Sequence, residues 1–171
     1  MATTYTLISS VTVGSGNSAS IEFTSIPQTY TDLILSWSGR HYTAFSSPLC
    51  NIVIELNGST SNFSGIYLEG NGSSASSSTF ARFVGVDNTT TSTSNTFSNN
   101  TLYIPNYTSS NYKSFSADSA QETNASSAQL TFNAGLWSNS NAITSLKILS
   151  QNSNQDFLQY STAYLYGISN A

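Results

Sequence analysis

The chain has 171 residues, of which 35 are Ser, 21 Thr and 18 Asn, while only 7% are charged and the formal net charge is −4 at pH 7. Four Lys and Arg side chains without a basic stripe argue against nucleic-acid binding through phosphate neutralisation. No apolar run reaches the roughly 18 residues of a membrane-spanning helix. The 38% of hydrophobic residues can still form a core, and the length indicates one domain over residues 1–171.

Apolar and polar residues alternate in short runs along the whole chain, which predicts half-buried β-strands. In chain order the predicted strands span residues 4–13, 20–26, 32–40, 51–57, 63–69, 80–86, 100–104, 112–122, 128–137, 143–150 and 159–168. The clearest runs predict these buried-face residues: Ile21 and Phe23; Leu33, Leu35 and Trp37; Ile52, Ile54 and Leu56. No segment predicts a helix longer than two turns.

Gly and Asn mark the breaks between the predicted strands. Residues 14–17 (Gly-Ser-Gly-Asn) read as a hairpin loop, and Asn57-Gly58 and Asn71-Gly72 are dipeptides typical of tight turns. Residues 71–79 and 88–100 consist mostly of Ser, Thr, Asn and Gly and are predicted as long loops at one end of a sandwich. The sequence therefore predicts an all-β fold, a β-sandwich of jelly-roll type with about ten or eleven strands.

The aromatic residues are assigned mainly to the core and its edges. The aromatic side chains predicted to fill the core are Phe23, Trp37, Phe83, Phe115, Phe132 and Trp137. Tyr103, Tyr107 and Tyr112 cluster around one turn, and Tyr combined with Ser and Asn is typical of recognition surfaces. We expect these three to be candidate partner contacts, with Tyr107 and Tyr112 exposed because they flank the polar turn 108–111.

The residue types that carry catalysis or bind metal ions are scarce. His41 is the only histidine, is expected to be partly exposed after the Trp37 strand, and accompanies no G-x-S-x-G motif. Cys50 is the only cysteine, so a disulfide framework and a Cys/His zinc site are both excluded, and we expect it in the core. Glu55 and Glu69 could pair as in a glycosidase, but their alternation predicts solvent-facing positions. We expect no enzyme, no cofactor and no resident metal ion.

Two further possibilities stay open at this stage. Carboxylates around Asp118 and Glu122, or around Glu69 and Asp87, could hold calcium, although no loop has an ordered ligand spacing. Residues 1–6 lack the pattern of a signal peptide, so we interpret the Asn-x-Ser/Thr sequons as a by-product of composition. The sequons begin at Asn57, Asn62, Asn71, Asn88, Asn99, Asn106 and Asn124.

Five segments together resemble small β-rich structural proteins of tailed bacteriophages, particularly phages of aquatic bacteria. These segments are residues 4–10 (TYTLISS), 26–33 (IPQTYTDL), 102–119 (LYIPNYTSSNYKSFSADS), 134–146 (AGLWSNSNAITSL) and 159–168 (QYSTAYLYGI). The resemblance spans nearly the whole chain and consists of strand and turn patterns, so it carries no catalytic residues over to this sequence. It implies a component of the virion.

The resemblance and the residue composition together predict a non-enzymatic protein on the outer surface of the virion, on the capsid rather than the tail. A capsid decoration (cement) protein or a head-fibre subunit would contact the major capsid protein and other virion proteins. We expect a homo-oligomer that binds neither nucleic acid nor membrane, and a trimer is the form that suits a three-fold position of a capsid. The alternative is a tail-fibre or receptor-binding domain that contacts host surface glycans, but neither an adaptor segment nor a repetitive shaft is visible in the chain.

Overall fold

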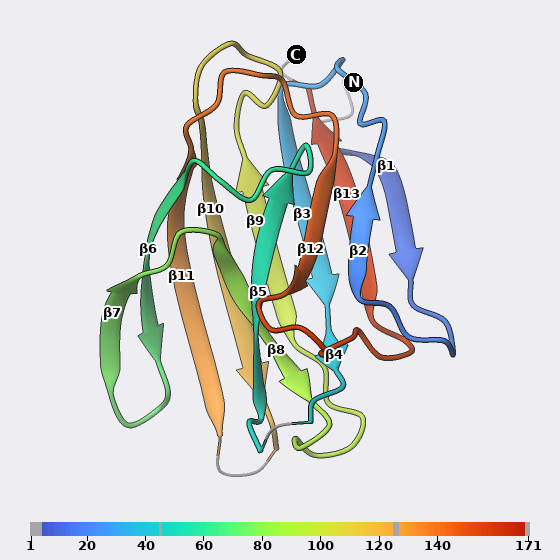
Figure 1. The fold of residues 1–171 in the computed structure, drawn as a ribbon, viewed down its shortest axis with the longest axis vertical. Helices are drawn as coiled ribbons and strands as arrows, with labels where there is room; N and C mark the ends of the chain where they lie inside the picture. The colour runs from blue at the N-terminus through green and yellow to red at the C-terminus, as the bar shows by residue number, and fades with distance from the viewer. Residues whose placement is uncertain (1–4, 45, 125–126, 170–171) are drawn as a thin grey trace.

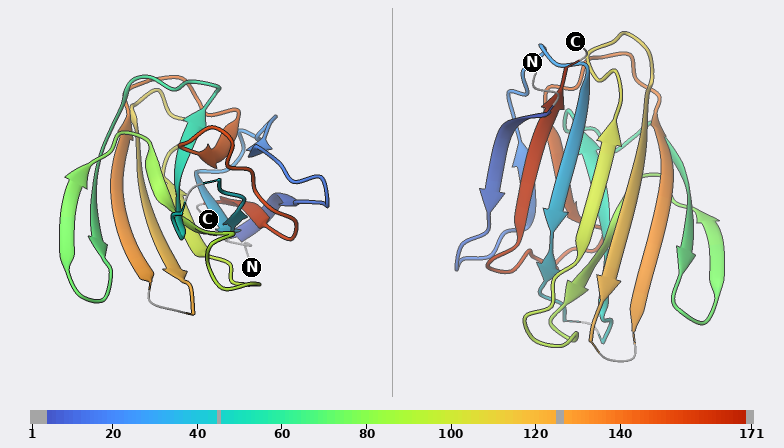
Figure 2. Two further views of the ribbon diagram at one scale, coloured as in Figure 1. Left: turned by 60° about the horizontal axis from the view of Figure 1, so that its bottom comes forward. Right: turned by 180° about the vertical axis from the view of Figure 1, so that it is seen from behind.

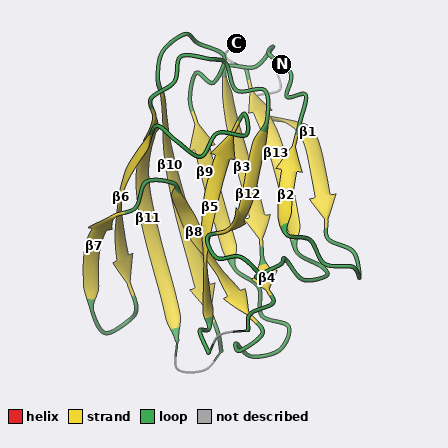
Figure 3. Cartoon of the chain, in the orientation of Figure 1, coloured by secondary structure: helices red, strands yellow, loops and turns green. Residues whose placement is uncertain are grey.

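The computed structural model describes residues 5–44, 46–124 and 127–169. Over these ranges it contains thirteen β-strands in two sheets and no helix (Figure 1, Figure 3). The predicted all-β sandwich is confirmed, with more strands than the ten or eleven expected. The two sheets have eight and five strands, and the jelly-roll connectivity stays a prediction.

Both sheets are almost entirely antiparallel, and many of their neighbouring strands are far apart in sequence. The eight-stranded sheet has the order β1 (Tyr5–Thr12), β13 (Thr162–Ile168), β3 (Asp32–Ser38), β9 (Asn99–Ile104), β10 (Lys113–Glu122), β11 (Ala128–Trp137), β6 (Phe63–Gly70) and β7 (Ala75–Thr79). The five-stranded sheet has the order β2 (Ser20–Phe23), β12 (Leu146–Ser150), β5 (Leu49–Leu56), β8 (Phe83–Thr89) and β4 (Arg40–His41). Among the strands that the structure describes, only β4 and β8 pair in parallel.

Each predicted strand overlaps an observed one, whereas β4 and β7 were missed. The prediction of a loop over residues 71–79 is wrong, because β7 pairs with β6 from Ile66↔Thr79 to Gly70↔Ala75. A run of Ser and Thr has no apolar alternation, so only pairing with a neighbour identifies it as a strand. At the end of β3 the chain leaves the larger sheet at Gly39, and β4 joins the smaller one (Figure 2).

The abundance of Asn is explained in part by the turns. Of the nine non-glycine residues described with positive φ, seven are Asn, whose short amide side chain tolerates the left-handed region better than most. Asn57 and Gly58 both have positive φ and form a tight turn after β5, as predicted. Residues 14–17 do form a turn, but the predicted hairpin is wrong, since β1 and β2 belong to different sheets.

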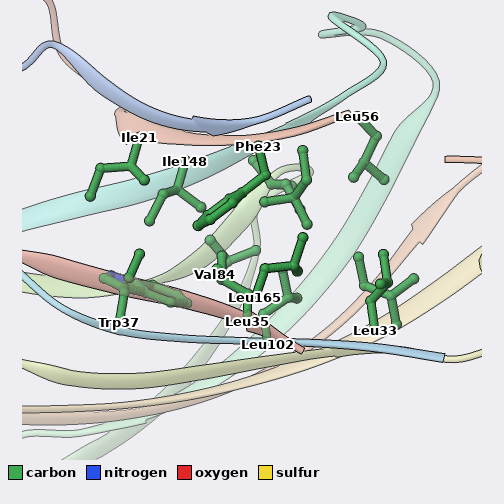
Figure 4. Close-up of a cluster of buried hydrophobic side chains, with 14 of the residues drawn as sticks. Ile21, Phe23, Leu33, Leu35, Trp37, Leu56, Val84, Leu102, Ile148 and Leu165 are labelled. Carbon is green, nitrogen blue, oxygen red and sulfur yellow. The ribbon is translucent and has the colours of Figure 1, made fainter. Parts of the chain in front are cut away.

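The core lies between the two sheets, where side chains from both are directed toward each other (Figure 4). Ile21, Phe23, Leu56, Val84 and Ile148 come from the smaller sheet, and Leu33, Leu35, Trp37, Leu102 and Leu165 from the larger. All of these are at most 3% exposed, which confirms the faces predicted for the strands over 20–26, 32–40 and 51–57. Of the predicted core aromatics, Phe23, Trp37, Phe83, Phe115 and Trp137 are buried.

Candidate functional site

The three tyrosines predicted as partner contacts occupy different environments. Tyr112 is 61% exposed, as expected. The expected exposure of Tyr107 is wrong: its side chain is fully buried and its hydroxyl donates to the carbonyl of Pro27. Tyr103 is half-buried and donates to Asp32 Oδ2 at 2.8 Å, and this bond raises the pKa of Tyr103. Only Tyr112 therefore presents most of its ring to a partner, and contact by these residues stays a prediction.

The larger sheet has an exposed apolar surface on β6 and β11, which the sequence analysis did not predict. On β11, Thr131 and Asn133 are 1% and 6% exposed, whereas Leu130 and Phe132 are 59% and 64% exposed. The prediction that Phe132 fills the core is therefore wrong. Alternation separates the two faces of a strand correctly, but it does not say which face is covered.

The neighbouring strand β6 continues the same exposed surface. Its Ile66 and Leu68 are 55% and 53% exposed, and Leu68 lies opposite Phe132 in the strand register. We call the four side chains Ile66, Leu68, Leu130 and Phe132 the β6–β11 patch. A shallow hollow of about 280 Å³ opens between Ile66, Leu68 and Phe132. Apolar side chains gathered in this way on adjacent strands mark surfaces that contact other molecules.

The patch lies next to an open sheet edge. β7 ends the eight-stranded sheet, so its outer edge has no partner strand among the described residues. Its sequence, Ala75 followed by three Ser and Thr79, contains none of the Lys or Pro residues that usually protect such edges. An unprotected edge and an apolar face therefore adjoin at one side of the molecule. Figure 2 shows β6 and β7, in green, at the end of the larger sheet.

A buried polar cluster joins β3, β4, β8 and β9. The carboxylate of Asp87, which is not exposed at all, accepts hydrogen bonds from Trp37 Nε1 at 3.2 Å, Asn100 Nδ2 at 2.9 Å and Ser98 Oγ. Its Oδ2 lies 3.0 Å from His41 Nε2. The expectation of a partly exposed His41 is wrong, since the ring is fully buried and packs on Phe157.

The cluster has the residue types of a catalytic triad but not its accessibility. Burial lowers the pKa of His41, but the hydrogen bond with Asp87 and the nearby Cys50 thiol outweigh burial and raise the pKa to about 10. Cys50 is 1% exposed, as predicted, and its single S–H lies within hydrogen-bond distance of two acceptors, Ser150 Oγ at 3.2 Å and Gln155 Oε1 at 3.4 Å. Because His41, Asp87 and Cys50 are all enclosed by the two sheets, a substrate could not reach them in this conformation. We interpret the cluster as a structural link between the sheets.

The remaining carboxylates considered from the sequence are engaged separately. Glu55 accepts from Lys147 Nζ at 3.0 Å and lies 3.7 Å from Arg82 Nη1. Glu69 instead accepts from Ser76 and Gln129. In the described ranges no three His, Cys, Asp or Glu side chains are grouped so that they could hold a metal ion.

Comparisons with protein-family models, with curated proteins and with solved structures found no match to this chain. Over the part of the chain that is described, no helix has the length and apolar character needed to cross a membrane.

Proposed function

We propose that this chain is a non-enzymatic structural protein of a phage particle, displayed on the capsid as a decoration (cement) protein or a head-fibre subunit. The phage assignment is supported by the sequence resemblance in five segments. The assembly role is supported by one structural observation, the reversed polarity of β11, which buries Thr131 and Asn133 while it exposes Leu130 and Phe132.

Reversed polarity has a physical cost that assembly would remove. Each apolar side chain left in water forgoes about 25 cal/mol for every Å² that a partner could cover. A decoration protein covers such surface at several weak contacts at once. Because all of these contacts hold the same particle, the overall affinity is much higher than that of any single contact. The β6–β11 patch provides one such contact, and the open edge of β7 beside it can add backbone hydrogen bonds.

The same surface suits contact between copies of the chain. In a closed oligomer, symmetric copies would cover both the patch and the β7 edge, which removes the risk of open-ended strand pairing. A trimer is the arrangement expected at a three-fold position of a capsid, where the chain would also contact the major capsid protein.

Cryo-electron microscopy of intact virions tests the proposed location. Hundreds of ordered copies on the shell would support capsid decoration, whereas a few copies at the tail would overturn it in favour of the receptor-binding alternative. Mass spectrometry of the purified virion would confirm that the density belongs to this chain. Absence of the chain from the virion would overturn the assignment altogether.

The role of the patch is tested on the isolated protein by light scattering coupled to gel filtration. We expect an oligomer, and we expect L68S combined with F132S to convert it to a monomer without changing the circular dichroism spectrum. Y160S is the matched control, because Tyr160 is 68% exposed, lies outside the β6–β11 patch, and its loss should leave the mass unchanged. A monomeric wild-type protein that also fails to bind capsid shells would contradict the proposal.

A further inference from the structure

A cleft opens between the smaller sheet and the side of the larger one. It has a volume of about 390 Å³ and is lined by residues of β5, β6, β7, β8 and the start of β11. Aromatic rings form one wall: Tyr67 meets Phe83 edge-on at 4.9 Å between centroids, and Phe80 stacks on Phe83 at 5.2 Å. Tyr67 and Phe80 remain partly exposed, so their surfaces are accessible from the cleft.

Polar groups form the opposite wall and the floor. Glu69 accepts from Ser76 Oγ at 2.8 Å and from Gln129 Nε2 at 2.5 Å, which fixes its carboxylate inside the cleft. Asn51 on β5 is half-buried beside Leu49. The Tyr67 hydroxyl has no hydrogen-bond partner within the described ranges, so it is free to bond a ligand. The cleft thus combines aromatic surface with fixed acceptors and amide donors.

The cleft continues beyond β5 as a groove. A second hollow of about 430 Å³ shares Leu49 and Asn51 with the cleft, and reaches Asn152 and Gln155. A third hollow of about 570 Å³ shares Asn152 and Gln155 with the second, and ends beside Tyr42, which is 49% exposed. We call this series of three hollows the amide groove. It has an aromatic ring at each end and room for an extended chain.

The charge of the groove selects the chemistry of its occupant. Its lining includes two carboxylates, Glu69 and Asp156, and no Lys, Arg or His. A phosphorylated, sulfated or nucleic-acid chain would meet these carboxylates without a compensating cation. Exposed or half-buried amides line the groove along its length: Asn51, Asn71, Gln129, Gln151, Asn152 and Asn154. Gln155 is buried, and its amide is already bonded to Ser150 and Thr43. Amide and carboxylate groups bond well to hydroxyls, while aromatic rings cover the apolar faces of sugars.

An extended peptide fits less well. Peptides that add to a sheet need an unpaired strand edge. β5, which lines the first two hollows, is already paired with β12 and β8 on its two sides, and β7, whose outer edge is open, lines only the first hollow. A chain that offers many hydroxyls and no charge does not need such an edge.

We infer that the amide groove binds a neutral oligosaccharide chain, with one sugar against Tyr67 and Phe80 and another against Tyr42. This binding activity is independent of assembly through the β6–β11 patch, which lies on the outer face of the larger sheet.

The test uses the full chain and three neutral hexasaccharides: cellohexaose, maltohexaose and N-acetylchitohexaose. Titration calorimetry should detect binding of at least one of them, and ¹H–¹⁵N spectra should show shifts at Asn51, Gln129 and Asn152. N51A should weaken binding about tenfold, a typical loss for one ligand-bonding group. N99A, an exposed Asn on another strand, is the matched control and should bind normally.

The length of the groove is tested at its far end. Y42A should weaken binding of the hexasaccharide about tenfold but leave the corresponding disaccharide unaffected. Y5A, which removes a similarly exposed ring outside the groove, should change neither. Three results would overturn the inference. They are binding by N51A and Y42A as strong as by the wild type, stronger binding of a sulfated hexasaccharide, and no binding of any of the three probes at millimolar concentration. The oligomer mass of the same variants is measured as well, so that a failure to bind oligosaccharide can be told apart from a failure of the assembly proposal.

Discussion

His41 Nε2 and Asp87 Oδ2 lie 3.0 Å apart, and neither residue has any surface exposed to solvent. The two residues come from neighbouring parallel strands, β4 and β8. A buried ion pair adds little net stability, because both charges lose their hydration. Removing one partner is nevertheless costly, because the other charge is then buried without a counter-charge. The pair therefore fixes where β4 joins the smaller sheet.

Removal of the Asp87 carboxylate should destabilise the protein strongly. D87A leaves the donors of Trp37, Asn100 and His41 without their acceptor, so we expect a loss of about 3–5 kcal/mol in the free energy of unfolding. Urea denaturation followed by tryptophan fluorescence measures this. D118A removes an exposed carboxylate from β10 and should change stability by less than about 0.5 kcal/mol.

Stability should also depend on pH through His41. Its pKa in the folded protein is about 10, above the value of about 6.5 in an unfolded chain. The folded state therefore holds the proton more tightly, and the stabilisation is complete below about pH 6.5 and is lost as the pH rises toward 10. Thermal unfolding at a series of pH values should show this decline. In H41Q the decline should be smaller, and an identical profile in both proteins would contradict a protonated His41.

Gly39 should not tolerate a side chain. A Cβ atom at this position would lie 1.9 Å from Asp87 Oδ2, a distance that forces the buried carboxylate to move. We expect G39A to cost at least about 1–3 kcal/mol, the usual range for overpacking. G16A is the matched control, because a Cβ there meets nothing within 4 Å. Equal melting temperatures for the two variants would show that the Asp87 cluster is not rigid.

Two phenylalanines on adjacent strands should differ sharply in their contribution to stability. Phe115 is 4% exposed and its ring fills the space above Gly135, so F115A should cost about 3–5 kcal/mol. Phe132 is 64% exposed, so F132A should cost less than about 1 kcal/mol in the isolated chain. The free energies of unfolding of both variants are compared by chemical denaturation, at a protein concentration below that at which copies associate. A large loss for F132A would mean that the patch is already covered in the folded monomer.

Some of the candidate sites could not be found from the sequence. The Asp87 cluster draws on β3, β4, β8 and β9, and no local signal relates His41 to a carboxylate 46 residues away. Tyr107 was expected to be exposed because it precedes a polar turn, yet its ring is buried and its hydroxyl bonds to Pro27. The amide groove joins β5 to the turn after β12, again through segments that are remote in sequence.

The sequence by itself determined eleven of the thirteen strands and most of the turns. Both follow from local rules: alternation with a period of two, and the tolerance of Gly and Asn for positive φ. It also determined that Leu33, Leu35 and Trp37 share one face. The tertiary structure alone decided which strands became neighbours and which face was covered. Leu68 and Phe132 show the difference, because their alternation is regular but the smaller sheet packs against the opposite face of their strands. Burial depends on what lies across the sheet, and that is a non-local property of the folded chain.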